Sequence, residues 1–310
     1  MKKTLFLLTI AAIIFSSCKK EHGLTTKIPS AKKYAVHIQV ANFTVSHANF
    51  ALRTKASHLA SSDTLTDLAS YADLLYYVVL DGNYNIVKTI VHDSTYCSAM
   101  GTITDSLPAG NYNIAMVAGR KGLAVATNSV ATYYNYGGNA WQDTFWSTFP
   151  LTVGNQDASL TTTLNRVVGK LEVTLLDNIP VNAYSLFISV AGDAFEKDIR
   201  TPLSFDQKTT VFAVGIPASA KGKPNFTVDR LLGAIEAGVD VTITCNDAGG
   251  HVINSVTAYT VIIHANQKTI LSGNLFTGSG NNSPSQTFTV VADTTWSSGV
   301  TQAGFSLKRH

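Results

Sequence analysis

Short runs in which apolar and polar residues alternate recur along the whole chain, and turn residues separate them. The clearest runs are Tyr34–Ala41, Leu171–Leu175 and Tyr184–Val190. A period of two is typical of a β-strand that buries one face and exposes the other. The runs recur at a spacing of roughly 8–12 residues, without a sustained β-α-β alternation or a coiled-coil heptad pattern. The sequence therefore predicts an all-β fold built from β-sandwiches.

Turn residues join several of these runs into hairpins. Two apolar runs that flank Asp-Gly or a Gly-rich turn are typical of antiparallel strands. The two predicted hairpins are 74–80 with 86–91 around Asp81-Gly82-Asn83, and 239–245 with 251–258 around Asn246–Gly250. Leu107-Pro108-Ala109-Gly110 is a further turn, because proline presets φ and glycine can take a positive φ. It begins a predicted strand over 112–118.

The alternating pattern restarts after Asn165–Gly169, which we interpret as the join between two tandem domains. The predicted domains are residues 34–164 and 165–310. One stretch departs from the strand pattern: Leu65, Leu68, Ala72 and Leu75 have helical spacing, and they predict a short helix just before the strand at 74–80.

The N-terminus has the order of features found in a secretory signal peptide. Lys2 and Lys3 precede the apolar run Leu5–Phe15, which is too short to span a bilayer that needs about 20 residues. Ser16-Ser17-Cys18 follows, and the chain then becomes polar. We expect residues 1–17 to be the signal and residues 18–33 to be a flexible spacer. A plain signal peptide with an unrelated cysteine is the alternative.

Phe15-Ser16-Ser17-Cys18 resembles the lipobox of bacterial lipoproteins, in the style of Bacteroidetes sequences. The resemblance implies that the Cys18 thiol receives a diacylglyceryl group and that cleavage makes Cys18 the mature N-terminus. Two or more acyl chains are enough to hold a protein stably on a membrane. The body after Cys18 would then be tethered to an envelope.

The charge balance excludes some classes of partner. Removing residues 1–17 takes away Lys2 and Lys3 and lowers the formal net charge from +3 to +1. Such a chain has no basic surface for nucleic acid. Charged residues make up only 14% of the sequence, which suits an exported β-protein. Cys97 and Cys245 lack CxxC spacing and are interpreted as buried small apolar residues, although an oxidising compartment would also permit a disulfide.

One segment is crowded with aromatic residues around Gly137-Gly138. Its members are Tyr133, Tyr134, Tyr136, Trp141, Phe145, Trp146 and Phe149. Flat aromatic faces beside flexible glycines could stack on sugar rings, which makes Tyr133, Tyr134, Tyr136, Trp141 and Trp146 candidate contacts for a glycan or another partner. The alternative is that these side chains fill a sandwich core or pack a seam between domains.

No catalytic or metal-binding pattern emerges from the sequence. The eight histidines are scattered without metal-ligand spacing, and no nucleophile elbow, P-loop or dinucleotide-binding fingerprint is present. Asp73 with Asp81, or Asp193 with Glu196 and Asp198, could be paired carboxylates for glycoside cleavage. The simpler interpretation is that they are loop and strand-end acids. We therefore expect no enzymatic activity, no cofactor and no metal.

Several local motifs occur in a particular order along the chain. They are the lipobox at Cys18, the hairpin around Asp81-Gly82, Leu107–Tyr112, Leu164–Val173, Asn266–Phe276 and the closing strand before Trp296. Together they resemble the Bacteroidetes fimbrial anchor family of the FimB/Mfa2 type, within the fimbrillin-like lipoproteins. The resemblance implies two tandem transthyretin-like, Greek-key β-sandwiches and an outer-membrane anchor of palmitate-type chains on Cys18. It also implies cell adhesion and fimbrial, pilin-like subunits as partners.

Two functions stay open at this point. The first is a lipid-anchored surface protein that anchors, caps or joins a fimbria-like polymer through strand edges, by β-augmentation. The second is a surface glycan-binding lipoprotein that works with a sugar-uptake system. Within the first, a stalk or tip subunit would lose an N-terminal segment to a protease, for which Lys27, Lys32, Lys33 and Arg53 are possible cut sites.

Overall fold

The computed structural model describes residues 31–44, 68–97, 99–127, 131–135, 141–201, 203–277 and 288–293. The signal peptide predicted over 1–17 and the lipid-attachment residue Cys18 lie outside the described residues. The chain divides into two units, Met1–Lys32 and Lys33–His310, and every described strand belongs to the second. Among the described residues, no helix is long and apolar enough to cross a membrane.

The first sheet has seven strands, and both of its halves contribute to one core. Its order is β3-β2-β5-β8-β9-β1-β4. The strands are β1 (Lys33–Thr44), β2 (Leu74–Leu80), β3 (Ile86–Asp93), β4 (Thr102–Pro108), β5 (Gly110–Gly119), β8 (Thr144–Val153) and β9 (Ala158–Arg166). Val36 and Ile38 of β1 share a buried cluster with Ile114 and Met116 of β5. The sheet is thus folded over on itself as the first sandwich.

β1 is an inner strand of this sheet. It pairs in parallel with β9 on one side and antiparallel with β4 on the other. Val36 and Ile38 are buried, whereas His37 between them is exposed. The predicted alternation, with His37 on the solvent face, is confirmed.

The second sandwich has two sheets that enclose a separate core. One sheet has the order β13-β10-β16-β17. The other contains β15, β14 and β11 in that order. β12 also belongs to it, because the residues of β11 that pair with β14 pair with β12 as well. The strands are β10 (Val168–Leu175), β11 (Ala183–Asp198), β12 (Ser204–Gly215), β13 (Phe226–Gly233), β14 (Ile235–Asp247), β15 (Val252–Ile263), β16 (Lys268–Gly273) and β17 (Thr289–Asp293). Alternate residues of β10 and β11, such as Leu171 and Ile188, are buried between the sheets. The all-β prediction is confirmed.

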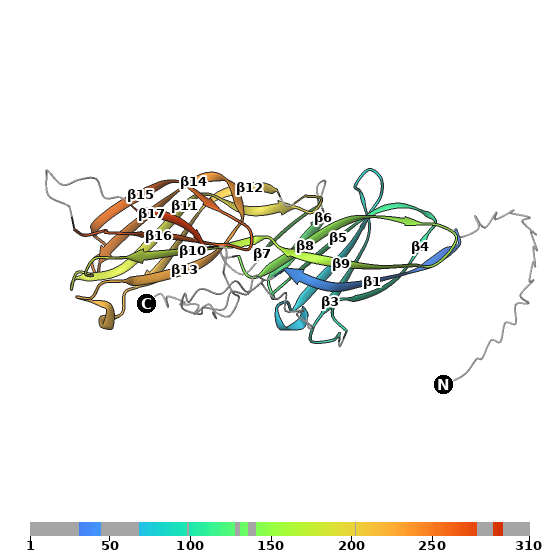
Figure 1. The fold of residues 1–310 in the computed structure, drawn as a ribbon, viewed down its shortest axis with the longest axis horizontal. Helices are drawn as coiled ribbons and strands as arrows, with labels where there is room; N and C mark the ends of the chain where they lie inside the picture. The colour runs from blue at the N-terminus through green and yellow to red at the C-terminus, as the bar shows by residue number, and fades with distance from the viewer. Residues whose placement is uncertain are drawn as a thin grey trace, which may run out of the picture. The chain divides into compact units, whose positions relative to one another are not determined.

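A hairpin from the first half of the chain belongs to a sheet of the second sandwich. Its strands are β6 (Leu123–Thr127) and β7 (Ala131–Asn135), and β7 pairs antiparallel with the end of β11 at Lys197 and Asp198. The sheet order is accordingly β15-β14-β11-β7-β6 (Figure 1). Strand pairing therefore crosses residue 164, where we placed the domain boundary, and that boundary stays a prediction.

The helix expected from the spacing of Leu65, Leu68, Ala72 and Leu75 is wrong over the described residues. Leu68–Ser70 forms one turn of 3-10 helix, Leu75 lies in β2, and Leu65 is outside the described residues. Leu68, Ala72 and Leu75 are nevertheless all buried in the first core. The spacing correctly indicated burial on one side, but a tight turn followed by a strand achieves it. The second 3-10 turn, Ala218–Ala220, lies between β12 and β13.

The two described cysteines differ in exposure. Cys245 is buried in the second core, as predicted. Cys97 is only partly buried, because it lies in the turn after β3, and its Sγ is 3.5 Å from His92 Nδ1. The expectation of a buried Cys97 is corrected. Both thiols are free.

Candidate functional site

The aromatic segment lies where the two sandwiches meet. The indole N–H of Trp141 donates a hydrogen bond to the carbonyl oxygen of Ala194, and that of Trp146 donates to the carbonyl of Ile199 at 2.8 Å. Trp141 is buried and Trp146 is partly buried. A buried indole usually needs an acceptor for its N–H, and here β11 and the residue after it supply one. Both tryptophans therefore connect the first sandwich to the second.

The tyrosines of the segment are divided between interior and surface. Tyr133 is fully buried, and its ring meets that of Trp141 edge-on at a centroid distance of 6.3 Å. Tyr134 is partly buried and stacks on Phe195, with centroids 6.5 Å apart and planes 17° apart. Tyr136 lies outside the described residues. A sugar cannot reach Tyr133 or Trp141 in this arrangement. Glycan contact at Tyr134, Tyr136 and Trp146 stays a prediction, which a glycan array probed with the purified body would test.

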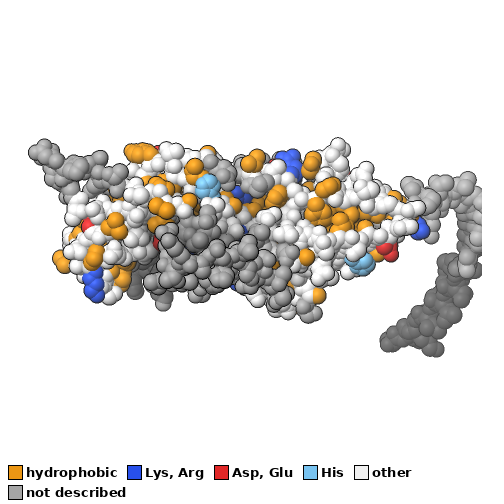
Figure 2. Space-filling model, viewed as in Figure 1, with side chains coloured by type: hydrophobic (Ala, Val, Ile, Leu, Met, Phe, Trp, Pro, Cys, Tyr) orange, Lys and Arg blue, Asp and Glu red, His pale blue; other side chains and the backbone are white. Residues whose placement is uncertain are grey.

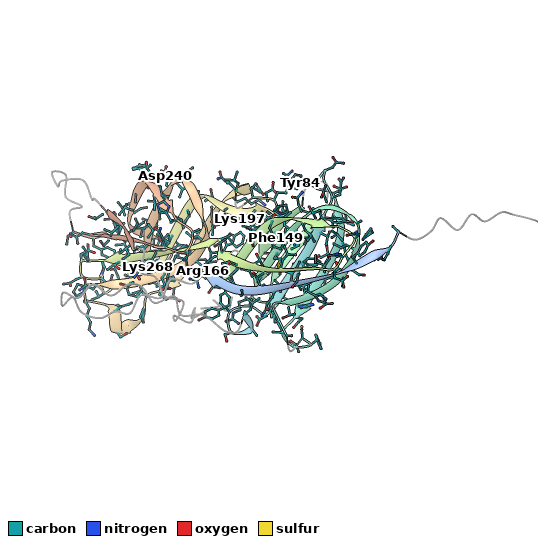
Figure 3. All side chains as sticks on the ribbon, turned by 45° about the vertical axis from the view of Figure 1, so that its right-hand side comes forward. Tyr84, Phe149, Arg166, Lys197, Asp240 and Lys268 are labelled. Atoms are coloured by element: carbon teal, nitrogen blue, oxygen red, sulfur yellow. The ribbon has the colours of Figure 1, made fainter. Side chains whose placement is uncertain are left out.

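Two buried cations lie at the same junction (Figure 3). Arg166, at the end of β9, contacts Asp143 through Nε at 2.7 Å and through Nη2 at 2.9 Å, and its Nη1 donates to Asn266 Oδ1 at 3.2 Å. Lys197 of β11 donates to the carbonyl of Ala234 at 3.0 Å. A charge taken out of water must be paired and hydrogen-bonded, so these contacts hold the junction in one geometry.

Asp193 is a buried carboxyl close to the same junction. It lies next to an irregularity in the pairing of β11 with β12, and its Oδ2 accepts a hydrogen bond from the Thr210 hydroxyl at 2.8 Å. Burial raises the pKa of Asp193 from 3.8 to about 6, against the lowering effect of its hydrogen bonds and of Arg230. The folded state therefore holds this proton more tightly than the unfolded chain does.

A raised pKa in the folded state contributes stability that is fully present below pH 3.8 and is lost as the pH rises through about 6. We expect the contribution of Asp193 to stability to fall between pH 4 and pH 7, by at most about 3 kcal/mol. Asp193→Asn should remove that contribution, so that stability depends less on pH in urea unfolding measured at both pH values. Parallel curves for wild type and Asp193→Asn would contradict the assignment.

The carboxylates considered as catalytic pairs have structural partners. Asp73 lies 3.4 Å from Arg120 Nη1, and Asp81 accepts backbone N–H groups within its own turn. Glu196 accepts a hydrogen bond from Thr132 at 3.1 Å. Within the part of the chain that the structure describes, no group of three or more His, Cys, Asp or Glu residues could hold a metal ion.

The edge strands are the remaining candidates for contact with a partner. Among the described residues on the face shown in Figure 2, hydrophobic side chains form separate patches, and charged side chains are few. Four of the edge strands, β3, β4, β12 and β15, carry features that discourage pairing with another chain. Lys88 of β3 forms an ion pair with the buried Asp105 of β4, and the β12 and β15 ladders are interrupted by register shifts. These edges are poor templates for an added strand.

β17 differs from those edges. It pairs only with β16 among the described strands, and the register from Thr289 to Asp293 is uninterrupted. Val290 and Val291 are 45% and 49% exposed. The strand contains no lysine, arginine or proline. Among the described strands, the other side of β17 therefore has no backbone partner, and an edge of this kind can accept an incoming strand.

The comparisons with known proteins concern the fold. No protein-family model and no curated protein matches the sequence. A candidate adhesin from Bacteroides ovatus has a TM-score of 0.53 at 9% identity and covers 78% of this chain and 89% of its own. The fimbrial anchor protein Mfa2 from Porphyromonas gingivalis has a TM-score of 0.50 at 14% identity and covers 84% of this chain and 96% of its own. The chain shares the fold of these proteins.

A third similar structure is a candidate polysaccharide-binding protein from Bacteroides thetaiotaomicron. Its TM-score is 0.52 at 10% identity, and it covers 78% of this chain and 92% of its own. None of the three is described as an enzyme. The resemblance found in the sequence is thus confirmed at the level of the fold.

Sequence reasoning missed Phe195, Arg166 and Lys197 as members of the junction. One signal for the junction was present in the composition of two strands. Residues 75–80 and 114–118 are continuous apolar runs without polar alternation, which is typical of strands buried on both faces. Ala115 and Val117 are indeed buried on the face opposite Ile114 and Met116, in the cluster that also holds the aromatic side chains.

Proposed function

We propose that the protein is a lipid-anchored surface protein of the outer membrane that anchors, caps or joins a fimbria-like polymer. The shared fold with a fimbrial anchor and with a candidate adhesin supports an adhesive or fimbrial role. Acyl chains on Cys18 would hold the base, and a sheet edge would accept an extended strand from a polymer subunit. Backbone hydrogen bonds would supply most of the affinity, so few specialised side chains are needed.

The observation that carries the proposal is the β17 edge. Its exposed valines offer apolar side-chain contacts, and its regular register allows a continuous ladder with a new strand. An exposed edge of this kind would also be an aggregation site. A natural partner strand that covers β17 explains why the protein keeps such an edge. The partner would be an extended, apolar segment of a pilin-like subunit.

The position of β1 bears on the choice between a base and a stalk subunit. Cleavage at Lys27, Lys32 or Lys33 would leave β1 in its sheet, whereas cleavage at Arg53 would separate it from the body. Loss of β1 would strip β9 and β4 of their shared neighbour. We propose the base anchor, in which Cys18 and β1 stay on the same chain. Mass spectrometry of the N-terminus from native membranes would decide, because a lipidated Cys18 identifies the base, whereas a start near residue 30 or near residue 54 identifies a stalk or tip subunit.

A strand-edge variant tests the proposed partner contact. Val291→Lys adds charge to β17, and we expect it to lower recovery of pilin-like subunits with the protein from solubilised membranes by about tenfold or more. Val211→Lys is the matched control, because Val211 has the same 49% exposure but lies on β12. Equal recovery with both variants at normal stability would remove β17 from the mechanism. The absence of any pilin-like partner from the wild-type complex would count against the function itself.

A further inference from the structure

We propose that the two sandwiches form one mechanical body without a hinge, clasped together by the β6–β7 hairpin. This inference goes beyond the proposed function and does not depend on it. A hinge needs residues that are free to change φ and ψ between two rigid parts. In this structure the connecting residues are instead hydrogen-bonded to both sandwiches.

The linker between the two sandwiches is a single residue. β9 ends at Arg166 and β10 begins at Val168, so Val167 alone separates them. The N–H of Val167 donates to the Thr144 carbonyl at 3.0 Å, and its own carbonyl accepts from the N–H of Ala234 at 3.1 Å. Each polar group of this one linker residue is thus bonded to a different sandwich. Val167 is also buried, with an exposed fraction of 3%.

The hairpin adds a second connection. It leaves the first sheet after β5 and covers residues of β2 and β5, where Val78 and Val117 are fully buried beside Leu123 and Tyr133 of the hairpin. Its second strand then pairs with β11 of the second sandwich. One element therefore packs on the first sandwich and completes a sheet of the other. Separating the sandwiches would expose that apolar cluster and break the β7–β11 ladder at once.

Side chains on both sides of the linker add further connections. Trp141 and Trp146 donate to carbonyls on or just after β11, and Arg166 reaches Asn266 in the turn before β16. The N–H of Asn266 in turn donates to the Val168 carbonyl at 2.8 Å. Because the two tryptophans and Arg166 bond to separate segments of the second sandwich, a hinge motion would have to break some of these contacts. We expect the sandwiches to unfold together and to transmit a load as one piece.

Thiol labelling during denaturation tests this inference on the purified, full-length protein. Cys245 is buried in the second core and reports its opening. A variant that combines Ala118→Cys with Cys97→Ser reports the first core, because Ala118 is fully buried there. Ala72→Cys, at another fully buried position, provides a second reporter if the first variant fails to fold. A brief pulse of a thiol reagent across a urea series, read by mass spectrometry, gives a midpoint for each site.

The expected result is one shared midpoint for both thiols. Trp146→Phe removes one connecting hydrogen bond, and it should lower both midpoints by the same amount. Two separate midpoints in the wild-type background would overturn the inference, as would a Trp146→Phe shift confined to one thiol. No fimbrial partner enters the measurement, so its outcome is independent of the outcome of the pull-down experiment.

Discussion

Replacing Arg166 by methionine should lower the free energy of unfolding by about 3–5 kcal/mol, the usual effect of removing one partner from a buried ion pair. The Arg166 side chain has no exposed surface, and its guanidinium contacts Asp143 through two nitrogens. Burial raises the pKa of Asp143, and Arg166 opposes that effect. Methionine fills a similar volume, so the loss would reflect the unpaired carboxylate and the lost bond to Asn266 rather than a cavity.

The matched control is a second Arg–Asp pair that lies at the surface. Arg200 contacts Asp198 at 2.5 Å, but 40% of its side chain is exposed. Arg200→Met should therefore change stability by no more than about 1 kcal/mol. Adding Asp143→Asn to Arg166→Met should recover part of the loss, because it removes the unpaired charge. Equal losses for the two arginine variants in urea unfolding would show that Arg166 is not the buried connection described.

Gly169→Ala should destabilise the protein by about 3 kcal/mol, at the upper end for overpacking a well-filled site. A Cβ at this position would lie 2.5 Å from the backbone oxygen of His264 and 2.7 Å from Ile263 Cγ2. The backbone oxygen cannot rotate away as a side-chain tip could. β10 would have to move away from the end of β15, next to the linker at Val167.

Gly215→Ala is the corresponding control. Gly215 ends β12, and a Cβ there would meet no atom within 4 Å. We expect a change within about 0.5 kcal/mol, as for most surface substitutions. Thermal and urea unfolding of the two variants give the comparison. A Gly169→Ala protein as stable as Gly215→Ala would mean that β10 and β15 are packed more loosely than the distances indicate.

Local sequence patterns predicted many strands correctly because side-chain period and turn chemistry act over a few residues. The hairpin 74–80 with 86–91 is present as β2 and β3, and 112–118 lies in β5. The helix expected before β2 failed, since spacing alone cannot distinguish one tight turn packed on a core from a helix.

The candidate site was less predictable than the strands. The aromatic segment was correctly singled out as a group, but its members have different roles. Trp141 and Tyr133 are buried in the junction, whereas Tyr134 lies partly at the surface beside Phe195. Phe195 comes from β11, about 60 residues after Tyr134 in the chain. No local pattern carries that pairing.

The amino-acid sequence by itself determined the class of fold, because alternation of apolar side chains makes a strand amphipathic wherever it is placed. It also determined some of the chain reversals, such as the turns at 81–83 and 107–110, through residue types that favour turns. Only the tertiary structure decided that the β6–β7 hairpin joins the sheet of the later strands and that Arg166 is enclosed at the junction. Those outcomes depend on which distant surfaces bury the most apolar area and pair the remaining charges, and contacts of that kind leave no short-range period in the chain.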